Sequence, residues 1–304
     1  MSWDNAYESL TEEHDVSGHW AFGTGFADAL AGVGHDVPAD VDRAELAAYC
    51  VMLGDDALVF AQRLSEWCSN APELEEDVAL ANIALDLLGQ ARMLLTRAGE
   101  VDPTVRPAAA PEHVPDEDAL AYFRDERAFR NVRMVEQEPG DFAETVARLL
   151  VFGCWRLALF ERLAGSRDPV LSAIAAKGVK ELAYHRDHAA QWALRLGDGT
   201  EFSRERMRAG LDRVWPFVAE LFTPHPVETR LAEAGVAVDP AELRSTVDDV
   251  LDRVLVAAGL PRPETPALPA AAGLAGRHGV HTEPMGYLLA EMQHIARSHP
   301  AAVW

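Results

Sequence analysis

The chain carries little positive charge and almost no lysine. Its 304 residues include 49 acidic side chains against 27 lysines and arginines, and the only lysines are Lys177 and Lys180. The net charge of −22 repels phosphate backbones and anionic lipid headgroups over most of the surface. We therefore expect no nucleic acid partner and no membrane partner. The scarcity of lysine is by itself no sign of a binding site.

Cysteines and export signals are also scarce. Cys50, Cys68 and Cys154 lie far apart in apolar helical stretches, so the chain has neither a disulfide framework nor a zinc-ligand spacing. The N-terminus is acidic where a signal peptide is basic, and no apolar run reaches the roughly 18 residues of a membrane span. These features predict a protein of the reducing cytoplasm.

Motifs of several common enzyme classes are missing as well: the sequence has no Gly-rich phosphate loop, no nucleophile elbow and no Cys/His pairing at a useful spacing. Apolar residues, 49% of the chain, instead recur at helical spacing. Four long helices are predicted at residues 42–67, 73–98, 141–165 and 168–197. Two short turns pair them and one long crossover joins the pairs, which predicts an all-α, ferritin-like four-helix bundle.

The rest of the chain is predicted to be helical or connecting. Residues 1–40 form an N-terminal extension, and residues 41–304 form the ferritin-like helical domain. The crossover combines a Pro/Ala-rich stretch at 103–115 with an intermediate helix at 116–138. Additional C-terminal helices are expected at 201–222, 239–260 and 283–298, with a Pro/Ala-rich linker at 261–276. No strand is required.

The second long helix has two apolar faces and one narrow polar stripe. The first face carries Leu74, Val78, Ala81, Leu85, Leu88 and Leu95, and the second carries Ile83, Leu87 and Leu94. Such a helix is predicted to be buried between neighbours. The polar stripe of Asn82, Asp86 and Gln90 then faces either solvent or a polar bundle interior.

A di-iron site in such a bundle takes a carboxylate from each of two helices and Glu-x-x-His from each of the other two. The second helix has Asp86 and Gly89 at those two places, so the imidazole is missing. On the first helix Asp56 is the better inward candidate. Asp55 points about opposite the apolar stripe, and we interpret it as a solvated or interface residue. Antiparallel pairing of the helices allows Asp56 and Asp86 to form one carboxylate pair.

The other two helices complete this comparison. On the fourth helix Glu181 is followed at i+3 by Tyr184, with His185 at i+4 and His188 beyond it. The third helix has no carboxylate between residues 144 and 161. We therefore predict no catalytic residue, no bound cofactor and no metal site in this chain. The positions of the degenerate site are Asp56, Asp86, Gly89, Glu181, Tyr184 and His185.

Structural roles account for the same residues. Asp86 is expected to be a paired structural carboxylate, with Lys177, Lys180, Arg92 or an arginine of a partner chain as its counterpart. His185, on an apolar stripe, is expected to be a core histidine, and its spacing allows a bond to Glu181 across one helical turn.

Several long segments resemble the C subunits of bacterial phenylacetyl-CoA epoxidases. They are residues 49–58, 63–68, 74–92, 175–185, 195–201 and 281–293. The third of these segments includes Leu-Asp-Leu-Leu-Gly-Gln. The resemblance runs from about residue 44 to the C-terminus. The long N-terminal extension and residues 227–269 depart from the family pattern.

The resemblance implies a role in a multicomponent monooxygenase. In that family the complex converts phenylacetyl-CoA to its ring 1,2-epoxide with oxygen and electrons from NADPH. The A subunit carries the di-iron site, the reductase carries FAD and an iron-sulfur centre, and a small B subunit is a further partner. The C subunit is a ferritin-like relative without a working metal site, and it associates with A.

Two other functions remain open at this point. The first is an active di-iron oxygenase or oxidase that uses Asp56, Asp86, Glu181, His185 and His188. The second is a helical interaction protein with no link to oxygenases.

Overall fold

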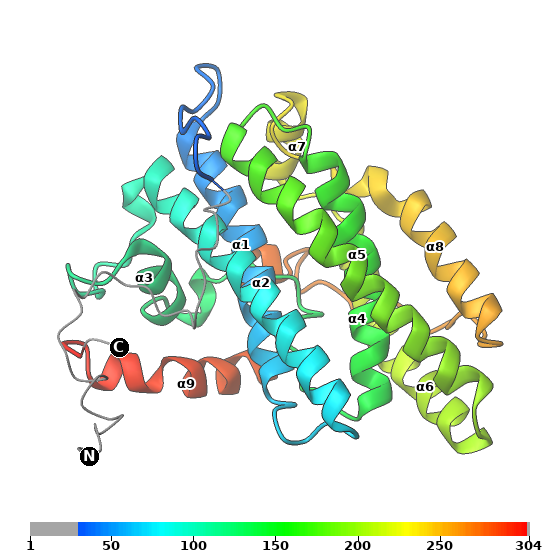
Figure 1. Cartoon of the computed structure of the whole chain (residues 1–304). Coiled ribbons are helices and arrows are strands. Elements are labelled where there is room, and N and C mark those ends of the chain that lie inside the picture. The colour runs from blue at the N-terminus through cyan, green and yellow to red at the C-terminus, as the bar shows by residue number, and fades with distance from the viewer. Residues whose placement is uncertain (1–29, 303–304) are drawn as a thin grey trace, which may run out of the picture.

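Two helical hairpins form the centre of the structure (Figure 1). The first consists of α1 (Arg43–Ser65) and α2 (Leu74–Val101), and the second of α4 (Phe142–Leu163) and α5 (Pro169–Asp198). This computed structural model describes residues 30–302, where the only β-type pairing is a single bridge between Ala271 and Leu274. The predicted all-α bundle with one long crossover is confirmed. Most of the predicted N-terminal extension lies outside the described residues, so its separation from the helical domain stays a prediction.

Aspartate caps fix the start of three of the four long helices. The Asp42 side chain accepts a hydrogen bond from the backbone N–H of Glu45 at 3.0 Å. Asp141 caps α4 and Asp168 caps α5 through equivalent bonds of 2.8 Å each. Each carboxylate satisfies a backbone donor that has no partner within its helix. These caps set where α1, α4 and α5 begin.

The crossover contains much less helix than its sequence predicts. It contains η2 (Pro103–Val105), α3 (Asp116–Tyr122) and η3 (Glu126–Ala128), and the chain then runs without regular structure to α4. The predicted helix at 116–138 is wrong beyond α3. The backbone N–H groups of Arg130 and Val132 donate to carboxylates of α1 at 2.8 Å each, so they do not take part in a helical ladder.

The C-terminal third wraps around both hairpins. Its elements are α6 (Glu201–Val214), η4 (Trp215–Phe222), α7 (Pro226–Glu233), η5 (Pro240–Leu243), α8 (Arg244–Ala257), η6 (Gly276–His278) and α9 (Glu283–Ser298). Helices α6 and α8 pack on α4 and α5, whereas α7 packs on α1 and α9 on α3. The segments predicted at 201–222 and 239–260 are each part 3-10 helix and part α-helix. Helix α7 was not predicted.

Helix α2 is buried on only one of its two apolar faces. Ile83, Leu87 and Leu94 have no exposed surface, whereas Leu85 is 64% exposed. Leu74, Val78 and Leu88 are exposed on the same side as Leu85. Within this chain, the prediction that α2 is buried between neighbours is therefore wrong for the outer face from Leu74 to Leu88, whereas Leu95 of the same face is buried.

Helix α2 is long and apolar enough to cross a bilayer, although we expected no stretch of the sequence to reach the length of a membrane span. Among the described helices it is the one long and apolar enough, by length and composition, to cross a bilayer. Within the most apolar 18-residue stretch of this helix, 50% is buried inside the fold. The same length and composition occur in core helices of soluble proteins, so this observation is weak evidence for a membrane span.

Candidate functional site in the bundle interior

A guanidinium occupies the interior of the bundle. Arg156 of α4 is fully buried, and its Nε donates to Gln90 Oε1 of α2 at 3.0 Å. Its Nη2 donates to the backbone carbonyl of Leu53 in α1 at 3.2 Å. The Gln90 Nε2 donates in turn to Glu181 Oε2 of α5 at 3.0 Å. One chain of hydrogen bonds therefore links all four long helices through Arg156.

The charge of Arg156 persists in this environment. Burial lowers the pKa of Arg156 to about 10, and the nearby carboxylate of Asp56 opposes this shift. Burial raises the pKa of the Glu181 carboxyl overall, although the hydrogen bond from Gln90 acts in the opposite direction. Lys177 Nζ lies 3.9 Å from Glu181 Oε1. A fixed positive charge at this depth disfavours a metal cation beside it.

Arg156 was not among the predicted site residues, although the sequence contains a signal for it. It is the one charged residue in the otherwise apolar run at 149–160. A charge in such a run must be paired when the helix is buried. Its partner, Gln90, belongs to the polar stripe of α2. Along that stripe Asn82 is exposed, whereas Gln90 is buried.

Asp86 is paired, as expected, but with an unexpected partner. Its Oδ2 lies 3.0 Å from Nε2 of His185, whose side chain is 1% exposed, against 37% for Asp86. The expected partners Lys177, Lys180 and Arg92 are not used. Glu181 bonds Gln90 instead of His185. The pair therefore joins α2 to α5 across the two hairpins.

The remaining predicted positions lie on the same two helices, α2 and α5. Gly89 is partly exposed, and Tyr184 of α5 is 50% exposed. His188 Nε2 lies 3.1 Å from Glu76 Oε2, which also accepts a 2.7 Å hydrogen bond from Trp192 Nε1. Burial lowers the pKa of His188, and Glu76 opposes this. These side chains form separate pairs and do not converge on one point.

Asp55 is a buried anchor for the crossover. It has no exposed surface, contacts the guanidinium of Arg124 and accepts a 2.8 Å hydrogen bond from the backbone N–H of Arg130. The interpretation of Asp55 as a solvated or interface residue is therefore wrong. Its two carboxylate oxygens satisfy a side chain and a backbone donor of a segment about 70 residues away in the sequence.

Asp56 is buried as expected, yet it is used in the same structural way. Arg277 binds both of its oxygens, from Nη1 at 3.0 Å and from Nη2 at 2.8 Å. The backbone N–H of Val132 donates to Asp56 Oδ1 at 2.8 Å. Asp56 and Asp86 therefore have separate partners, and the possible carboxylate pair is not formed. Arg277 lies in the C-terminal segment and was not predicted.

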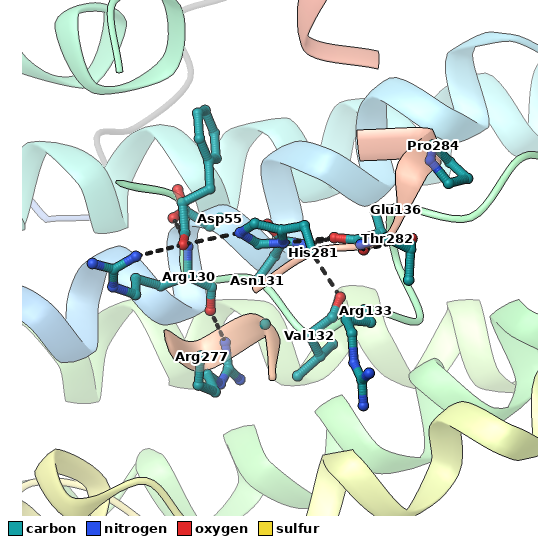
Figure 2. Close-up of polar contacts among 12 residues, drawn as sticks. Asp55, Arg130, Asn131, Val132, Arg133, Glu136, Arg277, His281, Thr282 and Pro284 are labelled. Atoms are coloured by element: carbon teal, nitrogen blue, oxygen red, sulfur yellow. Dashed lines mark hydrogen bonds and ion pairs between the residues drawn. The ribbon is translucent and has the colours of Figure 1, made fainter. Parts of the chain in front are cut away.

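A second ion pair holds the same C-terminal segment (Figure 2). Glu136 and His281 have fully buried side chains, with Glu136 Oε2 2.8 Å from His281 Nδ1. The other ring nitrogen faces the backbone carbonyl of Phe129 at 3.2 Å. Because both ring nitrogens face acceptors, the arrangement fits the imidazolium form. Burial lowers the pKa of His281, but Glu136 outweighs it and raises that pKa overall.

The donor set does not fit a di-iron centre. Within residues 30–302 no group of three or more His, Cys, Asp or Glu side chains is placed to hold a metal ion. Asp55 and Asp56 are paired with arginines, and Arg156 lies on the helix that should supply the second single carboxylate ligand. The interior is therefore built from ion pairs and hydrogen bonds among the helices themselves.

Comparison with known proteins agrees with the resemblance seen in the sequence. The model of a family described as phenylacetic acid catabolic protein matches residues 32–304. The C subunit of the 1,2-phenylacetyl-CoA epoxidase of Escherichia coli (strain K12) is 45% identical to this chain over 260 residues. That alignment covers 86% of this chain and 99% of the relative.

Proposed function

Since this chain belongs to the phenylacetic acid catabolic protein family, we propose that it is a non-catalytic structural subunit of a phenylacetyl-CoA 1,2-epoxidase. In this role it binds and stabilises the di-iron catalytic A subunit during aerobic phenylacetate degradation. The 45% identity to the C subunit of such an epoxidase supports the proposal over most of the chain.

The position of Arg156 is the observation that carries the non-catalytic assignment. A carboxylate ligand would have to project from α4 into the bundle, and Arg156 places a guanidinium there instead. Its hydrogen bonds to α1 and α2 hold the four-helix interior without a metal. The fold of a ferritin-like subunit is thereby retained, while no three ligand-type side chains of residues 30–302 come together to hold a metal, which supports the proposal.

A partner role is supported by the exposed outer face of α2. Leu74, Val78, Leu85 and Leu88 expose between 43% and 75% of their surface on this helix. Clustered exposed apolar side chains are typical of protein interaction sites. In this proposal the di-iron centre belongs to the A subunit and FAD and iron-sulfur belong to the reductase. The small B subunit is a further partner, and the complex works in the cytoplasm.

Iron analysis and reconstitution together test the proposal. The chain is purified alone and with the A subunit of the same epoxidase. Iron content and phenylacetyl-CoA turnover are measured for each, with the B subunit, the reductase and NADPH supplied in both turnover assays. We expect a stable complex, iron and turnover only when A is present, and a loss of A stability when the chain is omitted. About two iron atoms per isolated chain, together with turnover, would overturn the non-catalytic role. Failure of A and this chain to associate would overturn the partner role.

A further inference from the structure

A cavity of about 220 Å³ lies where the end of the crossover meets α4, α6 and η4. Its volume corresponds to about seven water molecules at roughly 30 Å³ each, which is room for one small organic molecule. Arg148 of the cavity lies about two turns before Arg156 on α4, so the cavity is separate from the polar contacts of the bundle interior. The lining residues are Met134, Gln137, Glu144, Arg148, Arg213, Val214 and Phe217.

Arg148 is a buried lining residue with a donor that lacks an acceptor. Its side chain is 2% exposed, and its Nη1 and Nη2 donate to the backbone carbonyls of Gln137 and Glu138 at 2.5 Å each. Its Nε is buried as well and has no hydrogen-bond partner. Burying an N–H group without an acceptor is costly. A ligand in the cavity that Arg148 lines can supply this acceptor.

The lining also carries more positive than negative charge. Glu144 serves both arginines, with Oε1 3.2 Å from Nη2 of Arg148 and Oε2 2.8 Å from Nη1 of Arg213. Two guanidinium groups therefore share one carboxylate. Burial lowers the pKa of Arg148 to about 10, although Glu144 opposes this shift. An anion in the cavity would provide the second negative charge.

Two carboxylates outside the lining affect the pKa values of these arginines, but each has another partner. Asp141 lies 2.6 Å from Arg206 and also caps α4. Glu66 lies 2.7 Å from Arg63. Neither of them lines the cavity. Ion pairing within the chain therefore leaves the second guanidinium of the cavity without a carboxylate of its own.

The apolar part of the lining indicates the rest of the ligand. It consists of Met134, Val214 and Phe217, and the first two are buried in the core. A methionine thioether and a phenylalanine ring both make favourable contacts with an aromatic ring. A small inorganic anion would leave this wall without a contact. An aromatic ring that carries one carboxylate would contact the apolar wall and the guanidinium groups together.

We propose that this cavity binds a small aromatic carboxylate. The carboxylate group accepts hydrogen bonds from Arg148 and Arg213, and the ring packs against Phe217. The bound ligand joins the end of the crossover to α4, α6 and η4, and it stabilises the folded chain because it binds that state. This site lies beyond the proposed function, since it needs no residue of another subunit.

Titration of the isolated full-length chain tests the site, with phenylacetate as the probe. We expect one site per chain with a Kd of about 0.1 mM by isothermal titration calorimetry. Benzyl alcohol retains the ring without the charge, whereas acetate and inorganic phosphate retain a charge without the ring. Each of these three compounds should bind at least about 10-fold more weakly than phenylacetate.

A charge variant tests the role of the guanidinium groups. Arg213→Gln removes the one that is 64% exposed, so the chain should fold, and the Kd for phenylacetate should rise by about 10-fold. Arg208→Gln on the same helix is the matched control, because Arg208 is exposed and does not line the cavity. It should change the Kd by less than about twofold. Arg148 is left unchanged because it also holds the end of the crossover.

A methyl resonance tests where the ligand lies. In a chain labelled with ¹³C-methyl methionine, phenylacetate should shift the resonance of Met134, which Met134→Leu identifies. The ring current of a bound aromatic group causes such a shift in methyl groups that it contacts. The resonance of Met52, on α1 and outside the lining, should stay unchanged.

Several outcomes would overturn the inference. They are an absence of binding up to about 5 mM phenylacetate, binding that Arg213→Gln does not weaken, and binding that leaves the Met134 resonance unshifted. Acetate or inorganic phosphate binding as tightly as phenylacetate would show a general anion site and overturn the aromatic ligand. All of these measurements use the isolated chain, so none of them decides whether it associates with the A subunit.

Discussion

Arg277 and Asp56 form a bidentate ion pair across 221 positions of the sequence, with N–O distances of 3.0 and 2.8 Å. Burial alone would lower the pKa of Arg277, but Asp56 and Glu228 outweigh it and raise that pKa overall. Arg277 also donates to the backbone carbonyls of Met52 and Arg130. The carboxylate best placed on α1 for metal chemistry thus holds the C-terminal segment to the bundle.

Replacing Arg277 is expected to destabilise the whole chain. Arg277→Ala leaves Asp56 buried without its counter-charge, and breaking a buried pair in this way costs about 3–5 kcal/mol. Urea unfolding followed by circular dichroism measures the loss. Arg208→Ala, at an exposed position of α6, is the control and should change the free energy of unfolding by less than about 0.5 kcal/mol. Equal stability of the two variants would contradict a structural role for the pair.

Arg156 is expected to be required for stability in a way that lysine cannot fully replace. Arg156→Ala removes the donor to Gln90 and leaves a cavity, so the free energy of unfolding should fall by about 3–5 kcal/mol. Arg156→Lys keeps the charge but not the fork that reaches both Gln90 and the Leu53 carbonyl, so its loss should be smaller. Denaturant midpoints measure this, and they should fall from the wild type to the lysine variant and again from the lysine variant to the alanine variant. A lysine variant as stable as the wild type would show that the two directed bonds contribute nothing.

Glu181 and His185 are expected to be dispensable for turnover by the complex. Glu181→Gln retains an acceptor for the Gln90 amide, and His185→Gln keeps a polar partner for Asp86. Once each variant is shown to fold and bind the A subunit, turnover of phenylacetyl-CoA should stay within about twofold of the wild type. Loss of turnover in a folded, assembled variant would instead indicate that one of them takes part in the chemistry.

The ion pair of His281 predicts a loss of stability at alkaline pH. Its pKa is raised in the folded state, so the pair contributes fully below the unfolded value of about 6.5. The contribution is lost as the pH rises from there through the folded pKa, by at most about 1.4 kcal/mol per pH unit. Free energies of unfolding of the wild type and His281→Gln, measured from pH 6 to 9, should converge. A constant difference between them would contradict the linkage.

The three thiols should differ sharply in reactivity. Cys68 is exposed just beyond the end of α1, not within a helix as its sequence context suggested, whereas Cys50 and Cys154 are buried. Burial raises the pKa of Cys154 to about 12 and also raises that of Cys50. A thiol-specific reagent should modify one cysteine per native chain and all three in denaturant. Rapid modification of a second thiol without unfolding would show that α1 or α4 opens locally.

Local sequence accounts for much of the helical framework. Asp42, Asp141 and Asp168 act on backbone donors three residues away, so their role as caps follows from local sequence. The absence of a carboxylate from the middle of α4 is likewise visible in the run at 149–160. By contrast, the crossover beyond α3 could not be predicted, because Asp55 and Asp56 bind its backbone from another helix.

The helical bundle and its family follow from the order of the residues, because helix period, caps and the segments shared with the family are properties of neighbours along the chain. The partners that neutralise the buried charges follow from the packing instead. Asp56 pairs with Arg277, and Asp55 pairs with Arg124. Each pair joins segments distant in sequence, and a buried charge is satisfied by whichever opposite charge the packing brings within a few ångströms. The same packing left one apolar face of α2 exposed, which the apolar pattern alone did not distinguish from its buried face.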